Sequence, residues 1–375
     1  MKIAIPSEIQ PGESRVAVSP DAVKAYIKKG AKVAVQAGAG LGSNISDADF
    51  KAAGADIVKG EAVVKDADLV LTIRRPGEKL LKAMKKDAIV AGGLEPFGDR
   101  KALEAFARSG VTGFAMELMP RITRAQAMDI LSSQANLAGY KAVIDAAANF
   151  GRAFPMMMTA AGTVSAARVF IMGVGVAGLQ AIATARRLGA QVSATDVRSA
   201  TKEQIESLGA KAIFVENVAG IEGEGAGGYA TEMSDEYKAA QAELVSSHIA
   251  KQDIVITTAL IPGRPAPRLI TDAQIASMKP GSVIFDLAVS QGGNVEGSKA
   301  DEIVVKHGVK IMGYANTPTH LAADTSALFA RNLFNFLSAF WDKEAGRPVL
   351  PDDDEITAAI RLTKGGKVVS ERLLG

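Results

Sequence analysis

The sequence predicts an α/β protein made of two Rossmann-like, doubly wound domains with a cleft between them. Its 375 residues exceed one ordinary hydrophobic core and suit two domains. Short apolar segments alternate with helical segments along nearly the whole chain, which is typical of parallel sheets covered by helices. A Gly-x-Gly-x-x-Gly motif also follows one of the apolar segments directly.

The first series of strands is expected before residue 120. The apolar segments are KIAIP, KVAVQAG, ADLVLTI, DAIVAGG and VTGFAMEL, with helical patterns such as SPDAVKAYIKKG between them. A polar turn, LMPRITRAQAMDILSSQ, follows at residues 118–134. One long helix from Ala125 to about Phe150 is then predicted, since no proline interrupts it. This helix is expected to connect the two domains.

A second alternating series forms the other domain, with strands expected in ARVFIM, QVSATD, AKAIFVE, DIVITTAL, GSVIFDLA and VKIMGYAN. The helix predicted at residues 325–342 carries bulky apolar side chains and is expected to return to the first domain. Two short strands around a Lys-Gly-Gly turn should follow it. The first domain is therefore predicted to be discontinuous, with residues 1–136 and 320–375, and the nucleotide-binding domain to comprise residues 137–319.

Composition excludes several classes of function. A net charge of +2 gives no reason to expect a nucleic-acid partner. The chain has no cysteine, and His248, His307 and His320 are scattered, so a metal site is not expected. The N-terminus lacks the apolar stretch and cleavage site of a signal peptide, which predicts a cytoplasmic location.

The Gly-x-Gly-x-x-Gly motif predicts a dinucleotide site. Glycines at these positions allow a tight turn and a close approach of the backbone to a pyrophosphate, at the N-terminus of the next helix. An aspartate about 20 residues further on, at the end of the next strand, suits the adenosine ribose and favours NAD over NADP. Arg198 could instead contact a 2′-phosphate. The candidate residues are Gly173, Gly175, Val176, Ala177, Gly178, Asp196, Val197 and Arg198.

Two loops after later strands are candidates for the nicotinamide end, because ligands of doubly wound sheets lie beyond the carboxyl ends of the strands. They are TTALIPG, with Thr258, Ala259 and Leu260, and DLAVSQGG; each could equally be an ordinary connection. The segment 216–233 has five glycines and is either a surface excursion or a functional loop. The two alternatives differ over Tyr229, an aromatic side chain that a simple linker would not need.

Taken together, these motifs resemble the NAD(H)-binding domain I of the proton-translocating NAD(P) transhydrogenases, the first polypeptide of a split alpha subunit, in a family related to the alanine dehydrogenases. The resemblance covers almost the whole chain and is carried by PRITRAQAMDILSSQANLAGY, FPMMMTAAGT, GVGVAGLQAIATA, ATDVR, TTALIPGRPAP, MKPGSVIFDLA and GGN. It implies that this chain binds NAD(H) and acts as a homodimer.

The resemblance also implies partners for this chain. A partner domain III of the beta subunit would bind NADP(H). A membrane domain II, formed by the second alpha polypeptide and the beta subunit, would translocate protons. The chain would then be attached to the cytoplasmic face of the inner membrane through these partners.

Roles for single residues follow from the same resemblance. Arg121, Gln126 and Asp129 match the family's polar loop that holds the nicotinamide, with Ser132 close behind. Gln126 would reach toward the nicotinamide ribose of the partner's nucleotide. Gly228 and Tyr229 match a mobile loop that closes over bound nucleotide.

Alanine dehydrogenase is the nearest alternative, because it shares the architecture and the ESRVAVSP pattern with Arg15. That family's substrate pocket carries a lysine, a histidine and an aspartate. Here Arg75 replaces the lysine, AGGLEP has no histidine, and Ser290 replaces the aspartate. Oxidation of an amine requires a group that takes its proton, whereas hydride transfer between two nicotinamides requires none. A non-catalytic NAD-binding module is a second alternative.

Overall fold

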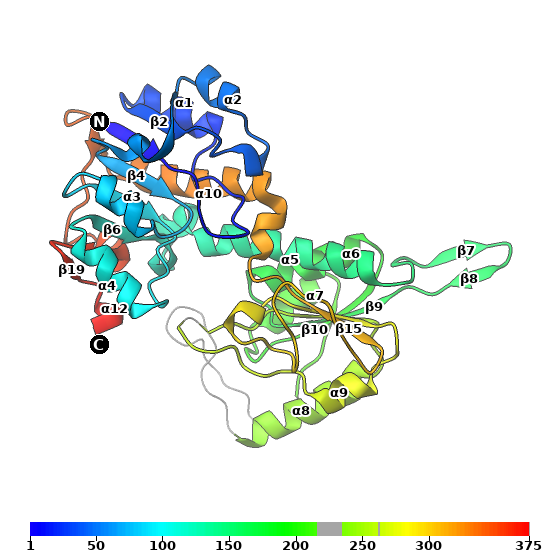
Figure 1. Ribbon diagram of the computed structural model, residues 1–375. Helices are drawn as coiled ribbons and strands as arrows, with labels where there is room; N and C mark the ends of the chain where they lie inside the picture. Colours follow the sequence, from blue (N-terminus) through cyan, green and yellow to red (C-terminus); the bar gives the residue numbers. More distant parts are fainter. Residues whose placement is uncertain (216–234, 262, 375) are drawn as a thin grey trace. The chain divides into compact units, whose positions relative to one another are not determined.

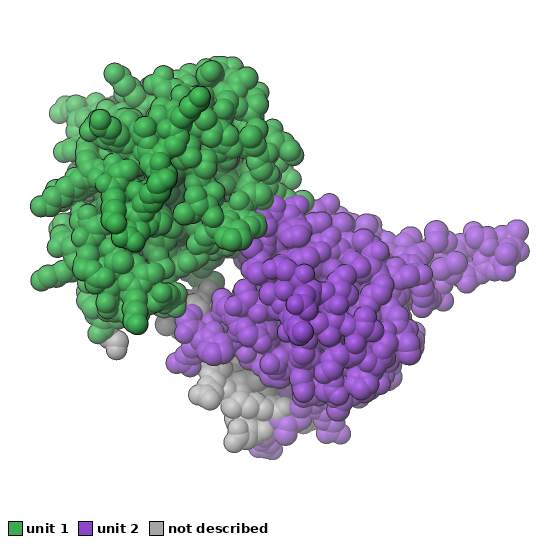
Figure 2. All heavy atoms as spheres, in the orientation of Figure 1, with its two compact units in different colours: residues 1–134, 321–375 green, residues 135–320 purple. Residues whose placement is uncertain are grey.

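The computed structural model describes residues 1–215, 235–261 and 263–374. The chain divides into two compact units, which Figure 2 distinguishes by colour. The first unit comprises Met1–Gln134 and Leu321–Gly375, and the second comprises Ala135–His320. Because the second unit is inserted into the first, the first unit's core needs both ends of the chain.

The first unit contains an eight-stranded sheet whose parallel part has the doubly wound order of a Rossmann fold. Two antiparallel strands from the C-terminal segment extend it beyond β6. They enclose a Lys-Gly-Gly turn, as the sequence predicts. In spatial order the strands are β19 (Lys367–Val368), β18 (Arg361–Lys364), β6 (Thr112–Ala115), β5 (Ile89–Gly92), β4 (Leu69–Thr72), β1 (Lys2–Ile5), β2 (Lys32–Gln36) and β3 (Asp56–Val58).

Helices cover this sheet and contribute to one continuous apolar core. The α10 helix packs Phe329, Leu333, Phe336 and Leu337 into it, all of them buried. The helices are α1 (Pro20–Lys28), α2 (Asp47–Ala52), α3 (Glu78–Ala83), α4 (Arg100–Arg108), α10 (Ala322–Ala339), α11 (Glu355–Ile360) and α12 (Glu371–Leu374). Shorter elements are the 3-10 helices η1 (Leu41–Ser43), η2 (Gly60–Val64) and η3 (Met116–Leu118), and the strand pair β16 (Trp341–Asp342) and β17 (Arg347–Pro348).

The predicted long helix begins five residues later than expected. Helix α5 runs over Ile130–Asn149, and residues Thr123–Met128 form a separate 3-10 helix, η4. The break lies at Asp129, whose backbone is extended and whose carboxylate accepts a hydrogen bond from the amide of Ser132. Aspartate in this geometry caps a helix, so it ends one element and starts the next. The polar turn is thus a defined structure of its own.

The second unit repeats the same strand order in a seven-stranded sheet, with β14 added antiparallel at one edge. Both units are therefore Rossmann-like, as predicted. In spatial order the strands are β11 (Lys211–Ala212), β10 (Gln191–Thr195), β9 (Arg168–Met172), β12 (Ile254–Thr257), β13 (Val283–Asp286), β15 (Val309–Met312) and β14 (Val304–Lys306).

Helices lie on both faces of this second sheet. Alternate residues of β9 face opposite ways, since Val169 and Ile171 belong to one apolar core and Phe170 and Met172 to another. The first core also takes side chains from α5, α6 (Val176–Arg187) and α7 (Thr201–Ser207), and the second from α8 (Asp235–Ile249) and α9 (Asp272–Ser277). The remaining elements are η5 (Val289–Gln291), η6 (Thr317–Leu321) and the hairpin β7 (Met157–Thr159) and β8 (Gly162–Val164).

The hairpin β7–β8 projects from the body of the second unit (Figure 1). Its three consecutive methionines are exposed, with Met156 at 63%, Met157 at 43% and Met158 at 79%. Within the described ranges, no helix combines the length and the apolar character needed to cross a membrane.

Candidate functional site

The turn between β9 and α6 is the first region of the candidate site. Gly173 directly follows β9 and has a φ of +99°, a conformation that glycine adopts readily and other residues rarely do. Its carbonyl accepts a hydrogen bond from Oγ1 of Thr258 at 3.0 Å, and its amide donates to the Thr195 carbonyl at 2.9 Å. The turn is therefore held from both neighbouring strands.

The other two glycines of the motif differ in what surrounds them. A Cβ on Gly178 would lie 1.9 Å from the Gly173 carbonyl oxygen, so α6 can approach the strand only without a side chain there. A Cβ on Gly175 would meet no atom within 4 Å. Gly175 is thus not needed for packing, and the space beside it, at the N-terminus of α6, fits an approaching pyrophosphate.

Asp196 lies beside this turn and is 8% exposed. Its Oδ2 accepts from the amide of Val174 at 2.7 Å, which ties the end of β10 to the glycine turn. Arg198 folds back onto the same carboxylate, with Nε 2.9 Å from Oδ1 and Nη2 3.1 Å from Oδ2. Both oxygens of the Asp196 carboxylate are therefore paired with the Arg198 guanidinium. Val197, between the two, is partly buried.

The loop after β12 is fixed by a buried asparagine. Oδ1 of Asn294 accepts from the Ala259 amide at 3.1 Å, and Nδ2 donates to the carbonyls of Ala259 and Pro267 at 2.9 and 2.8 Å. Thr258 reaches back to the glycine turn, and Leu260 is exposed. The structure therefore brings this loop and the glycine turn together on the second unit, at the carboxyl ends of adjacent strands.

The polar loop of the first unit is the second candidate region. In η4, Ala125 and Met128 are buried and anchor the loop, while Gln126 is exposed. Oδ1 of Asp129 accepts from the Ser132 amide at 3.1 Å and Oδ2 accepts from the Ser132 hydroxyl at 2.5 Å. Asp129 and Ser132 thus form one hydrogen-bonded pair.

The two arginines of the loop are both exposed. Nη2 of Arg124 donates to Oδ2 of Asp354 at 2.8 Å, which connects the loop to the start of α11. Arg121 lies two residues before η4. Predicted residues Gly228 and Tyr229 lie outside the described residues.

Known protein families match the chain over almost its full length. Residues 4–138 match the family model of the alanine dehydrogenase/PNT N-terminal domain, and residues 142–371 match that of the C-terminal domain. The chain belongs to the alanine dehydrogenase/PNT family.

Within this family the chain is similar to transhydrogenase subunits. It is 54% identical to the first polypeptide of NAD(P) transhydrogenase subunit alpha from Rhodospirillum rubrum, covering 100% of this chain and 99% of that protein. The crystal structure of a transhydrogenase from Sinorhizobium meliloti matches with a TM-score of 0.90 and 53% identity, over 98% of this chain and 100% of that one. Alanine dehydrogenase of Mycolicibacterium smegmatis is 31% identical, over 99% of this chain and 95% of that protein. The chain is therefore a transhydrogenase alpha-subunit homologue in an NAD-binding oxidoreductase family.

A network of ion pairs surrounds Arg15 near the N-terminus. Arg15 is buried, and its Nη2 lies 2.6 Å from Oε2 of Glu13 while its Nη1 donates to Oε1 of Gln134 at 2.8 Å. Arg74 pairs with Glu13 at 3.0 Å and with Glu95 at 3.2 Å. Arg15 therefore stabilises the first unit in this alanine dehydrogenase/PNT chain.

Arg75 is the residue that the resemblance places where alanine dehydrogenases have a lysine. Its Nη1 donates to the carbonyls of Leu94 and Glu95, at 3.3 and 3.5 Å. A guanidinium stays protonated near neutral pH, so Arg75 cannot act as a base.

The three histidines are engaged in separate places. His248 contacts the hydroxyl of Ser193 at 2.8 Å, and burial is the main cause that lowers its pKa. His307 contacts Asp272 at 3.1 Å, and His320 stacks on Tyr314 with ring centroids 4.0 Å apart. Among the described residues no three His, Asp or Glu side chains gather in an arrangement suited to a metal ion.

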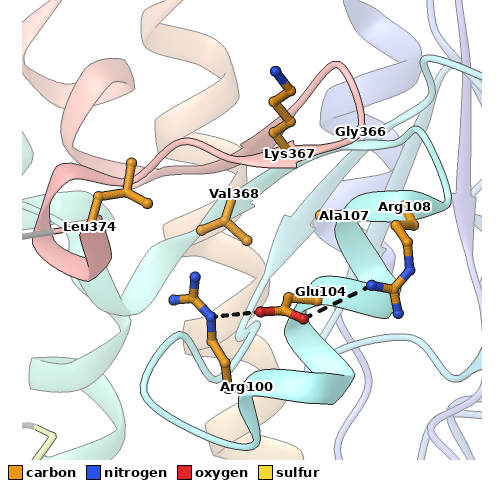
Figure 3. A pocket seen from close by; sticks show the side chains of 8 residues that line it. All are labelled: Arg100, Glu104, Ala107, Arg108, Gly366, Lys367, Val368 and Leu374. Carbon is orange, nitrogen blue, oxygen red and sulfur yellow. Dashed lines mark hydrogen bonds and ion pairs between the residues drawn. The ribbon is translucent and has the colours of Figure 1, made fainter.

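A shallow pocket of about 220 Å³ lies elsewhere on the first unit, between α4, β19 and α12 (Figure 3). Glu104 lies between Arg100 and Arg108 and pairs with both, at 3.1 and 3.9 Å. None of the residues predicted for the nucleotide site lines it.

The sequence did not identify two asparagines that fix the candidate loops. Asn294 holds the loop after β12, and Asn332 on α10 holds the polar loop through the Ala127 carbonyl. Asn294 belongs to the GGN motif that the family resemblance includes, but no local pattern marks a single buried asparagine on an apolar helix such as Asn332. Spacing therefore could not have identified Asn332.

Proposed function

We propose that this chain is the NAD(H)-binding component of a proton-translocating NAD(P) transhydrogenase, the first polypeptide of its alpha subunit, active only with its partner subunits. The observation that carries this proposal is the geometry of the glycine turn between β9 and α6. Because Gly178 has no side chain, α6 packs closely against the Gly173 carbonyl. Gly175 leaves open space at the N-terminus of α6. These residues fit a dinucleotide, and the high identity to transhydrogenase subunits supports the reaction.

Bound NADH supplies a hydride from C4 of its dihydronicotinamide directly to C4 of the NADP⁺ ring on the partner. No exchangeable proton takes part, so the protein's task is proximity, orientation and exclusion of water. Arg121, Gln126, Asp129 and Ser132 supply donors and acceptors for orientation. The hydrogen bond between Asp129 and Ser132 holds the carboxylate in place for this task.

The proposal assigns NAD(H) to this chain and NADP(H) to domain III of the beta subunit. Asp196 disfavours a 2′-phosphate by charge, and Arg198 is occupied by that carboxylate. Titration of the purified chain should therefore give clearly tighter binding of NADH than of NADPH. Equal affinity for the two nucleotides would refute this assignment.

Proton translocation belongs to membrane domain II, formed by the second alpha polypeptide and the beta subunit. The chain would attach to the cytoplasmic face of the inner membrane through these partners. We also propose a homodimer, for which the exposed methionines of the β7–β8 hairpin provide an apolar surface.

The decisive experiment mixes the purified chain with a recombinant NADP(H)-binding domain and measures hydride transfer between an NADH analogue and NADP. We expect turnover that needs both proteins. A mixture that binds both nucleotides without turnover would contradict the proposal.

Variants of the polar loop then test orientation. Gln126→Asn and Asp129→Asn should slow transfer by roughly tenfold or more, while the Kd for NADH changes much less, because a small displacement of the reacting rings is costly. Arg108→Ala is the control, since Arg108 is an exposed arginine of the first unit that pairs with Glu104 and not with a residue of the loop. Parent rates in Arg121→Ala, Gln126→Asn and Asp129→Asn together would exclude this role.

An alanine dehydrogenase-like amino-acid dehydrogenase is the second candidate, favoured by the shared family and by Arg15. It predicts ammonia-dependent oxidation of NADH with pyruvate by the chain alone. A non-catalytic NAD-binding module would instead bind nucleotide and show no turnover in either assay.

A further inference from the structure

Helix α10 holds the polar loop through two asparagine amides. Nδ2 of Asn332 and Nδ2 of Asn335 both donate to the carbonyl oxygen of Ala127, each at 2.9 Å. The two asparagines are three residues apart on a helix, so their side chains point the same way and can converge on one acceptor. Ala127 directly follows Gln126, the residue proposed to reach the partner's nucleotide.

Asn332 makes a second contact with the same segment. Its Oδ1 accepts from the hydroxyl of Ser133 at 2.7 Å, and the residue is only 7% exposed. A carbonyl oxygen can only accept, so the amide nitrogen must face Ala127 and the amide oxygen must face Ser133. One side chain thus contacts the chain on both sides of Asp129 and Ser132.

Two features of the polar loop indicate that its position depends on contacts with α10. The loop is a 3-10 helix, whose hydrogen-bond geometry is poorer than that of an α-helix, and its functional side chains are exposed or partly exposed. Hydrogen bonds from a helix limit the orientations that such a loop can adopt, and the two bonds of Asn332 are partly buried. The buried side chains of Ala125 and Met128 anchor the loop in the apolar core. The amides of Asn332 and Asn335 fix the loop against α10.

We propose that Asn332 is a positioning residue for hydride transfer, which fixes the polar loop by clamping Ala127 and Ser133. Asn335 supports it from the exposed side of the same contact. This inference rests on the proposed function. Neither asparagine needs to touch a nucleotide for the clamp to act.

The test uses the full chain with the NADP(H)-binding domain. Asn332→Asp keeps the shape and the acceptor but replaces the donor to Ala127 with an oxygen that repels the carbonyl. We expect transfer to fall by about tenfold or more, with the Kd for NADH within about twofold of the parent. Asn335→Ala, on a partly buried side chain, should slow transfer less, because it removes only one of the two donors to Ala127 and keeps the contact of Asn332.

Ser326→Ala is the matched control. Ser326 is also a buried polar residue of α10, but it bonds the Val16 amide and Ser43, at 3.0 and 2.8 Å, and not the loop. It should lower the thermal midpoint as Asn332→Asp does and leave transfer near the parent rate. Equal slowing in Ser326→Ala, or parent rates in both asparagine variants, would overturn the proposal.

A second readout does not depend on transfer. Arg124 is an exposed trypsin site within the loop. Cleavage after Arg124 should be several times faster in Asn332→Asp than in the parent or in Ser326→Ala, because a released loop opens more often. If the parent chain binds NADH yet shows no transfer, the proposed function fails, and unchanged cleavage would separately refute the clamp.

Discussion

At the scale of single residues, the motif glycines separate two physical roles. Gly175→Ala should leave the thermal midpoint unchanged, because the new Cβ meets no protein atom, and should raise the Kd for NADH about tenfold or more. Gly178→Ala should weaken binding and also lower the midpoint, since its Cβ would lie 1.9 Å from a carbonyl oxygen. Calorimetry and nucleotide titration of both variants check this. Equal loss of stability in both would contradict the assignment.

A second residue, Glu8, should make stability depend on pH. Burial, with a smaller contribution from Glu13, raises its pKa to about 7 despite hydrogen bonds from the Ile73 and Arg74 amides. The folded pKa lies above the unfolded value of 4.5, so the contribution is complete below pH 4.5 and is lost as the pH rises through 7.

Glu8→Gln should therefore remove part of this pH dependence. The parent should gain on the order of 1 to 3 kcal/mol of unfolding free energy relative to the variant between pH 8 and pH 5. Urea unfolding of both proteins at these two pH values measures it. A difference that stays constant with pH would show that Glu8 titrates normally.

At the scale of elements, α5 and α6 lie close together because α5 carries a glycine at their contact. A Cβ on Gly139 would lie 2.0 Å from the carbonyl oxygen of Ala177, in the first turn of α6. Gly139→Ala should therefore push away the N-terminus of the helix proposed to bind the pyrophosphate.

We expect Gly139→Ala to weaken NADH binding by roughly tenfold, as measured by titration. Gly151→Ala is the control, because a Cβ there meets no atom within 4 Å. If Gly139→Ala binds NADH as tightly as the control, the helix contact does not matter for binding.

Local sequence patterns predict an element well where the pattern itself sets the backbone conformation. The strand, glycine turn and helix around Gly173 were recognised because each glycine meets a local backbone requirement. The predicted start of the long helix, at Ala125, is wrong, because Asp129 caps α5. The spacing of apolar residues does not reveal where a capping residue begins a new helix. The roles of Asn294 and Asn332 could not be predicted from the sequence, because each contacts residues more than 25 positions away along the chain. Only the tertiary structure makes those contacts visible.

At the scale of the whole molecule, the proposed homodimer can be tested at the β7–β8 hairpin. Met158→Asp places a charge on the most exposed of the three methionines and should shift the chain toward monomer in analytical ultracentrifugation. Ile303→Asp, at an exposed apolar residue elsewhere in the second unit, is the control. A dimer that persists in Met158→Asp would show that the hairpin is not the interface.

The insertion of one unit within the other also dictates an order of events during synthesis. Strand β18 pairs with β6 across the first sheet, and α10 fills its core, so residues beyond 321 must leave the ribosome before the first unit can close. The second unit is complete by His320 and can fold as soon as it emerges. Until then the unfinished first unit leaves β6 without its partner strand β18 and its core without α10.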